Sequence, residues 1–311
     1  RMPAYHVERS IRVGAAESTV RSIIQDFNQW PDWSPWLCME PTAQITVFGT
    51  LGEVGHGYEW EGDLVGAGKM RIASQDAQRL AMDLFFLRPF KSEAKVGMQT
   101  RRLSEQETEV TWGMDGKLPF FMFFLVGMMK TMIGRDFERG LKMLKEYTET
   151  GGVRSKIEIV GVVDGPEFDY VGVGDRCTCD EISASMQRTL PAAMDQAKAN
   201  QLKVTGPPGA IYHESNLRQQ YFRYTAFVPV AKASNAGGMQ TGHCGPCRAI
   251  KVIHTGSYSH LGNAWSAAMS YQRYKKLKLS KSTAPFELYV NDPCETPEEQ
   301  IVTEIYVPVR A

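Results

Sequence analysis

The sequence predicts a mixed α+β protein built from two domains. Its 311 residues exceed the usual size of one domain. Segments of alternating polar and apolar residues, typical of antiparallel strands, fill most of the first half between two helical patterns. The second half repeats a pattern of strand, helix, strand and strand. Because the Gly151-Gly152 pair separates a helical pattern from a strand pattern, we expect domains at 1–150 and 151–311.

Composition excludes several classes of protein. Hydrophobic residues make up 43% of the chain and charged residues 23%, as in globular proteins. Basic and acidic residues both number 35, and the resulting net charge of zero argues against a nucleic-acid partner. The longest apolar run, residues 118–129, is shorter than the roughly 20 residues that a membrane span needs. We therefore expect a globular chain with no membrane span inside it.

The first domain reads as one sheet bracketed by helices. An alternating segment at 5–13 comes first, followed by a helical pattern at 16–27 and an aromatic loop at 30–36. A long helix begins at Pro119, has a Phe- and Met-rich face that we assign to the core, and continues to about Thr148. The strands expected between them are 44–48, 56–63, 68–74, 79–87, 92–102 and 108–114. This order describes a helix-grip fold, in which a curled sheet holds the last helix and leaves a cavity.

Four segments of this domain resemble the START-like (SRPBCC) polyketide cyclase superfamily. They are residues 7–11, 27–36, 116–120 and 134–141, and the resemblance covers about 4–149. The superfamily includes lipid carriers, hormone receptors, chaperone activators and cyclases on one scaffold. The resemblance therefore implies a fold and leaves the function open.

An internal repeat organises the second domain. Residues 192–194, 210–213 and 227–231 align with 267–269, 287–290 and 306–310, at offsets of 75, 77 and 79 residues. The two copies span about 157–232 and 247–311, and each reads as a βαββ unit. Binding sites often lie in the groove between two such copies.

The second domain resembles the GyrI-like family, the effector-binding module of multidrug-responsive transcription regulators. Residues 254–262, 286–293 and 303–309 carry the resemblance, which covers 155–311. It implies binding of lipophilic, often cationic, organic molecules. Some standalone members are linked to toxin resistance, and a subset hydrolyses cyclopropane-bearing genotoxins. The regulators attach this module to a helix-turn-helix domain, which a START-like domain replaces here, so DNA binding does not carry over.

Strand alternation indicates a candidate site in the second domain. In the strand at 286–290, Glu287 and Tyr289 share one face, and in the strand at 301–309, Glu304 and Tyr306 share one face. We expect the aliphatic faces to cover the helices and the Glu-and-Tyr faces to point toward the groove. A carboxylate among phenols suits a cation, or acts as a general base if burial raises its pKa. The alternative is a solvated strand face.

The candidate ligand site also takes in Tyr212, which aligns with Tyr289, and Trp265, which either lines the groove or belongs to the core. Glu287 is the candidate catalytic residue. The complete set of candidate ligand-binding residues is Glu287, Tyr289, Glu304, Tyr306, Tyr212 and Trp265.

The remaining reactive residues favour no further chemistry. His254 and His260 bracket a Gly-Ser-Tyr-Ser loop, without a serine elbow or an aspartate at triad spacing. Cys244 and Cys247 have thioredoxin-like spacing, but a strand pattern follows where that motif needs a helix, and Cys177-Thr178-Cys179 is poorly spaced to complete a zinc site. We expect a free or locally bridged cysteine pair and neither a metal nor a cofactor. In the first domain, Glu59, Glu61, Asp63 and Arg71 project either into the cavity or into solvent.

Three functions remain in view. The first is a small-molecule binding protein that sequesters or senses hydrophobic or cationic organic compounds. The second is a hydrolase of electrophilic, cyclopropane-type toxins in which Glu287 activates water. The third is a regulatory protein that binds a macromolecular partner. Two-domain chains of this resemblance often begin with a hydrophobic helix just before the pattern at residues 3–10, and a start at Arg1 fits the loss of such a segment. We therefore also expect an N-terminal membrane anchor or signal segment upstream of Arg1, and otherwise a cytoplasmic location.

Overall fold

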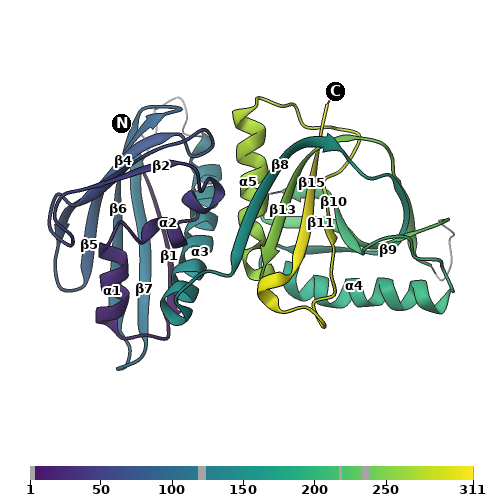
Figure 1. Ribbon diagram of the computed structural model, residues 1–311, viewed down its shortest axis with the longest axis horizontal. Helices are drawn as coiled ribbons and strands as arrows, with labels where there is room; N and C mark the ends of the chain where they lie inside the picture. The colour runs from purple at the N-terminus through teal and green to yellow at the C-terminus, as the bar shows by residue number, and fades with distance from the viewer. Residues whose placement is uncertain (1–3, 118–123, 217–218, 233–237, 311) are drawn as a thin grey trace. The chain divides into compact units, whose positions relative to one another are not determined.

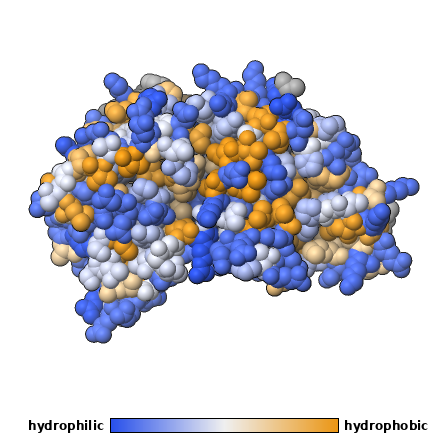
Figure 2. Space-filling view, in the orientation of Figure 1, coloured by the Kyte–Doolittle hydropathy of each residue, from blue (hydrophilic) through white to orange (hydrophobic). Residues whose placement is uncertain are grey.

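The computed structural model describes residues 4–117, 124–216, 219–232 and 238–310. The chain divides into two compact units, Arg1–Arg154 and Ser155–Ala311. Each unit combines one large antiparallel sheet with a few helices, so the chain is a mixed α/β protein (Figure 1). Hydrophilic residues cover much of the visible face, and hydrophobic patches are interspersed among them (Figure 2).

Among the described residues, no helix is both long enough and apolar enough to cross a membrane.

The first unit contains a seven-stranded sheet in the order β1-β7-β6-β5-β4-β3-β2. All neighbouring strands are antiparallel. The expected start of the last helix at Pro119 lies outside the described residues, and the expected aromatic loop contains the short helix α2. The elements are β1 (Ala4–Val13), α1 (Glu17–Gln25), α2 (Trp30–Trp33), η1 (Leu37–Met39), β2 (Gln44–Phe48), β3 (Gly57–Glu61), β4 (Ala67–Gln75), β5 (Arg79–Arg88), β6 (Ser92–Arg102), β7 (Thr108–Lys117) and α3 (Val126–Thr150).

Aromatic side chains fill the core between this sheet and α3. The rings of Trp112 on β7 and Phe137 on α3 stack with their centroids 4.7 Å apart, and Trp33 meets Trp112 edge-on at 5.7 Å. Gly140 lets the helix approach this cluster, because a Cβ atom at position 140 would lie 2.6 Å from Cζ3 of Trp112 and 2.9 Å from Cδ of Pro35. The close contact between α3 and the sheet therefore depends on a helical glycine.

The second unit contains an eight-stranded sheet in the order β12-β9-β11-β10-β14-β15-β13-β8. Helix α4 packs on β9 and β11, and α5 packs on β13, β8 and β15. The elements are β8 (Ser155–Asp164), β9 (Phe168–Thr178), α4 (Ile182–Ala199), β10 (Gly209–Asn216), β11 (Tyr221–Val230), β12 (Gln240–Cys244), β13 (Arg248–Gly256), η3 (Tyr258–His260), α5 (Leu261–Tyr274), β14 (Phe286–Tyr289), η4 (Glu298–Gln300) and β15 (Val302–Val309). Strands β10 and β14 meet in the middle of the sheet, and the central contact pairs Ala210 with Glu287.

Candidate functional site

The carboxylate of Glu287 lies buried at the centre of the second unit. Its side chain belongs to β14, and the residue is only 2% exposed. The hydroxyl groups of Tyr289 and Tyr212 both donate to Oε1, at 2.6 and 2.9 Å. The indole Nε1 of Trp265, on α5, donates to Oε2 at 2.9 Å. Two phenols and one indole thus satisfy both carboxylate oxygens.

Register explains why two tyrosines reach the same oxygen. Ala210 and Glu287 are directly paired across β10 and β14, which run antiparallel. Tyr212 and Tyr289 each lie two residues further along their own strand, so they share the face of Glu287 and flank it from opposite ends. The offset of 77 residues between them is that of the sequence repeat.

Aromatic rings and both helices enclose this group. Tyr212 meets the Trp265 ring edge-on at 5.4 Å, and Tyr258, just before α5, meets Tyr289 edge-on at 5.6 Å. The Tyr289 hydroxyl also lies 3.9 Å from Sδ of Met186, on α4. Tyr258 was not among the candidate residues predicted from the sequence, although it stands in the loop that His254 and His260 bracket.

Burial dominates the electrostatics of the group. Loss of solvent raises the pKa of Glu287, while the hydrogen bonds from Tyr289, Trp265 and Tyr212 oppose that rise. Burial and the neighbouring carboxylate raise the pKa of both tyrosines well above 10, so both hydroxyls remain protonated donors. All three donors are electrically neutral. A cation beside Glu287 would therefore supply the charge that these hydrogen bonds do not.

Glu304 and Tyr306 lie on the opposite face of the sheet, and the expectation that they share a face with Glu287 is wrong. Directly paired residues share a face, and the partner of Glu287 on β15 is Ile305. Tyr306 donates to Glu304 at 2.6 Å, and Nζ of Lys251 lies 2.7 Å from the same carboxylate. Alternation orders residues within one strand, whereas the register between two strands decides which faces coincide.

The expected orientation of the 286–290 strand is also wrong. Its apolar residues Phe286 and Leu288 pack with Tyr170 and Phe227 in a separate core that contains no residue of α4 or α5. The side that carries Glu287 faces α5 instead, as the hydrogen bond from Trp265 requires.

The cysteines form no site among the described residues. All six are free, and no group of three or more His, Cys, Asp or Glu side chains there is placed to hold a metal. Cys244 pairs with Phe168 at one end of β9, whereas Cys177 lies near the other end of this strand. Burial raises the pKa of Cys244 to about 12, the opposite of a redox-active thiol, and the segment after Cys247 is strand β13 as expected.

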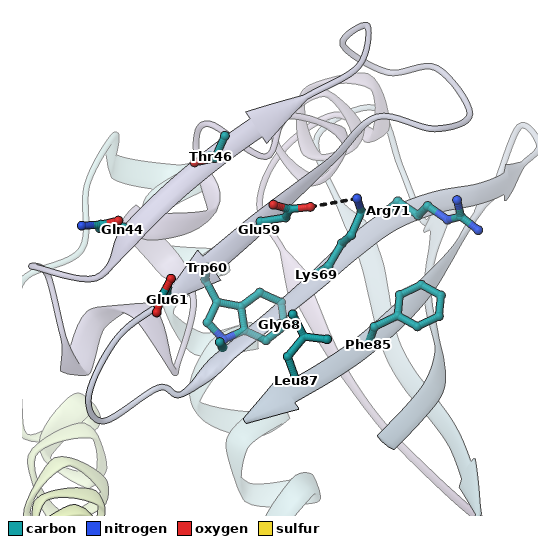
Figure 3. A pocket seen from close by; sticks show the side chains of 11 residues that line it. Gln44, Thr46, Glu59, Trp60, Glu61, Gly68, Lys69, Arg71, Phe85 and Leu87 are labelled. Atoms are coloured by element: carbon teal, nitrogen blue, oxygen red, sulfur yellow. Dashed lines mark hydrogen bonds and ion pairs between the residues drawn. The ribbon is translucent and has the colours of Figure 1, made fainter. Parts of the chain in front are cut away.

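A pocket of about 490 Å³ lies on the first unit, over strands β2 to β5 (Figure 3). Glu59, Glu61 and Arg71 line it from strand positions that alternate with the buried core residues, so they point away from the core. The ammonium group of Lys69 lies 2.8 Å from the Glu59 carboxylate, so two of the charged groups that line the pocket form an ion pair with each other. Asp63 follows the end of β3 and lies outside the strand.

Comparison with known families identifies the second unit. Residues 160–310 match the family described as "GyrI-like small molecule binding domain". These residues form a GyrI-like domain. No curated protein gives a significant match.

Three solved structures are each similar to a part of the chain. The EcmrR–DNA complex is 18% identical, covering 61% of this chain and 68% of that one, with a TM-score of 0.44. SAV2435 bound to tetraphenylphosphonium is 16% identical over 48% and 93%, with a TM-score of 0.39. A START superfamily protein from Mycobacterium smegmatis is 18% identical over 46% and 97%, with a TM-score of 0.34.

Proposed function

We propose that the GyrI-like domain binds lipophilic organic cations at Glu287, and that the protein sequesters or senses such compounds. The domain family supports a ligand-binding or effector role. The observation that supports a cation is the Glu287 carboxylate, which is 2% exposed. Among the described residues its hydrogen-bond donors are the neutral groups of Tyr212, Tyr289 and Trp265.

The chemistry of the surroundings matches this ligand class. A buried carboxylate loses hydration, and a ligand cation restores the lost charge compensation. The rings of Tyr212, Trp265, Tyr289 and Tyr258 add apolar contact area and faces of negative quadrupole. Because Glu287 is closed off by its donors, an entering cation must displace at least one of them. We propose that Trp265 moves, since its partner Oε2 has a single donor while Oε1 has two.

We also propose that the second unit is a duplicated βαββ unit and the first a START-like domain. In the second sheet, the order β9-β11-β10 is followed by β14-β15-β13, so the second set of three strands mirrors the first, as a duplicated βαββ unit would give. In the first unit, the order of one strand, short helices, six strands and a long helix fits a START-like helix-grip domain.

A hydrolase is the second candidate function. Burial raises the pKa of Glu287, the direction expected of a general base that activates water. Turnover of a strained cyclopropane electrophile that disappears in Glu287→Gln would favour this candidate over binding alone.

Calorimetric titration with tetraphenylphosphonium, a lipophilic cation without hydrogen-bonding groups, tests the binding proposal. We expect Glu287→Gln to weaken its affinity roughly 10- to 100-fold, because a desolvated charge contact is lost. Glu304→Gln is the matched control, since Glu304 also accepts from a tyrosine but lies on the other face. Equal effects of the two substitutions, or none, would contradict the proposal.

A further inference from the structure

Two buried polar atoms lie beside the Glu287 group without a hydrogen-bond partner among the described residues. They are Nδ1 of His254 and Oγ1 of Thr303. Both residues are 0% exposed. An unpaired polar atom in a protein interior costs free energy, so such a pair calls for an explanation.

Strand register places both atoms next to the proposed cation site. Thr303 on β15 pairs with Tyr289 on one side and with His254 of β13 on the other. The three side chains form a row on the face that carries Glu287, with about 5 Å from each residue to the next. Thr303 is therefore the direct neighbour of Tyr289, whose hydroxyl group donates to Glu287, and His254 is the next residue in the row.

The other half of the domain shows what a completed row looks like. There Tyr212, Tyr224 and Asp175 pair in the same way across β10, β11 and β9. The Tyr224 hydroxyl lies 2.5 Å from Oγ of Ser185 and 3.0 Å from Oγ1 of Thr189. The Asp175 carboxylate accepts from the Ser185 hydroxyl as well, so this row is closed by hydrogen bonds.

The second row differs in two side chains. Thr303 stands where the first row has the larger Tyr224, and His254 stands where it has Asp175. Oγ of Ser155 contacts Nε2 of His254 at 2.9 Å, which leaves Nδ1 as the ring nitrogen that faces no partner. With Thr303 in place of a tyrosine, the second row lacks the ring and the phenol hydroxyl that Tyr224 contributes to the first row.

We propose that His254 and Thr303 form a polar subsite that binds a neutral hydroxyl group of the ligand. This proposal rests on the proposed function. It assigns the ligands to lipophilic cations that carry a hydroxyl group, separated from the positive charge by the width of one or two strands. A hydroxyl both donates and accepts, and so it satisfies the threonine hydroxyl and the imidazole nitrogen together. The imidazole is neutral at physiological pH, because burial lowers its pKa to about 4, and so it selects a neutral group.

The test compares tetraphenylphosphonium with the three isomers of (hydroxyphenyl)triphenylphosphonium, at a pH where the phenol is neutral. We expect the wild-type protein to bind one isomer roughly tenfold more tightly than the parent cation, because two neutral hydrogen bonds are gained. Thr303→Val keeps the side-chain shape and should reduce this preference to less than about threefold. Affinity for the parent cation should remain, and the variant should fold, because the substitution removes an unpaired hydroxyl.

Tyr224→Phe is the matched control, since it removes a buried hydroxyl from the closed row and should leave the preference intact. Equal binding of all four cations, with Glu287→Gln still weakening each, would overturn the subsite alone. A preference that persists in Thr303→Val would also overturn it. Failure of all four cations to bind, or binding indifferent to Glu287→Gln, would overturn the proposed function and the subsite together.

Discussion

Acid should destabilise the second unit through His254. Burial, reinforced by the nearby His260, lowers the pKa of its imidazole from 6.5 to about 4. The unfolded chain then binds more protons than the folded chain between these two pH values, so stability is lost as the pH falls through that window. The expected loss approaches about 3 kcal/mol at pH 4.

An NMR titration of the imidazole C–H signals measures this directly. The His254 signal, assigned by its absence in His254→Asn, should remain at its neutral position down to about pH 5. Urea unfolding of both proteins at neutral pH and near pH 4 should show the acid loss in the wild type and its reduction in the variant. A titration midpoint near the ordinary histidine value of about 6.5 would contradict burial as the controlling influence.

Gly140→Val should destabilise the first unit by about 3 kcal/mol. A Cβ atom at position 140 would lie 2.6 Å from Trp112, whose ring is held by the stacked ring of Phe137. The added side chain must push α3 from the sheet or disrupt that stack, and overpacking of this kind costs about 1–3 kcal/mol or more. Thermal unfolding of the full chain measures the loss.

Gly127→Val in the same helix provides the comparison. No atom of the described residues lies within 4 Å of a Cβ built at Gly127, so this change should alter stability by less than about 1 kcal/mol. Similar losses from both substitutions would show that helix propensity, rather than contact with Trp112, determines the effect.

Local patterns in the sequence predicted most strands of the first unit and the alignment of Tyr212 with Tyr289 in the internal repeat. The strand expected at 44–48 is β2 (Gln44–Phe48), and the one expected at 92–102 is β6 (Ser92–Arg102). The repeat aligns Tyr212 with Tyr289 at an offset of 77 residues, and the hydroxyl groups of both donate to Glu287. These inferences succeed because alternation and repetition are properties of the chain itself.

Relations between strands could not be predicted in the same way. A register difference of one residue between β14 and β15 decides whether Glu304 or Ile305 lies beside Glu287, and nothing in either strand alone reports it. The same limit hid the position of His254 and Thr303, which lie beside the Glu287 group through the pairing of β13 with β15 and of β15 with β14. Their loop and strand positions carried no sign of burial, which a three-dimensional packing arrangement creates.

The most direct test of ligand binding at Glu287 is the NMR signal of the Trp265 indole N–H. This group donates to Glu287 at 2.9 Å, and Trp265 is the only tryptophan of the sequence after residue 154. Titration of ¹⁵N-labelled protein with tetraphenylphosphonium should shift this signal, identified by its loss in Trp265→Phe, along the same saturation curve as the calorimetric heat. Saturable binding that leaves the Trp265 signal in place would show that the cation binds elsewhere and would contradict a site at Glu287.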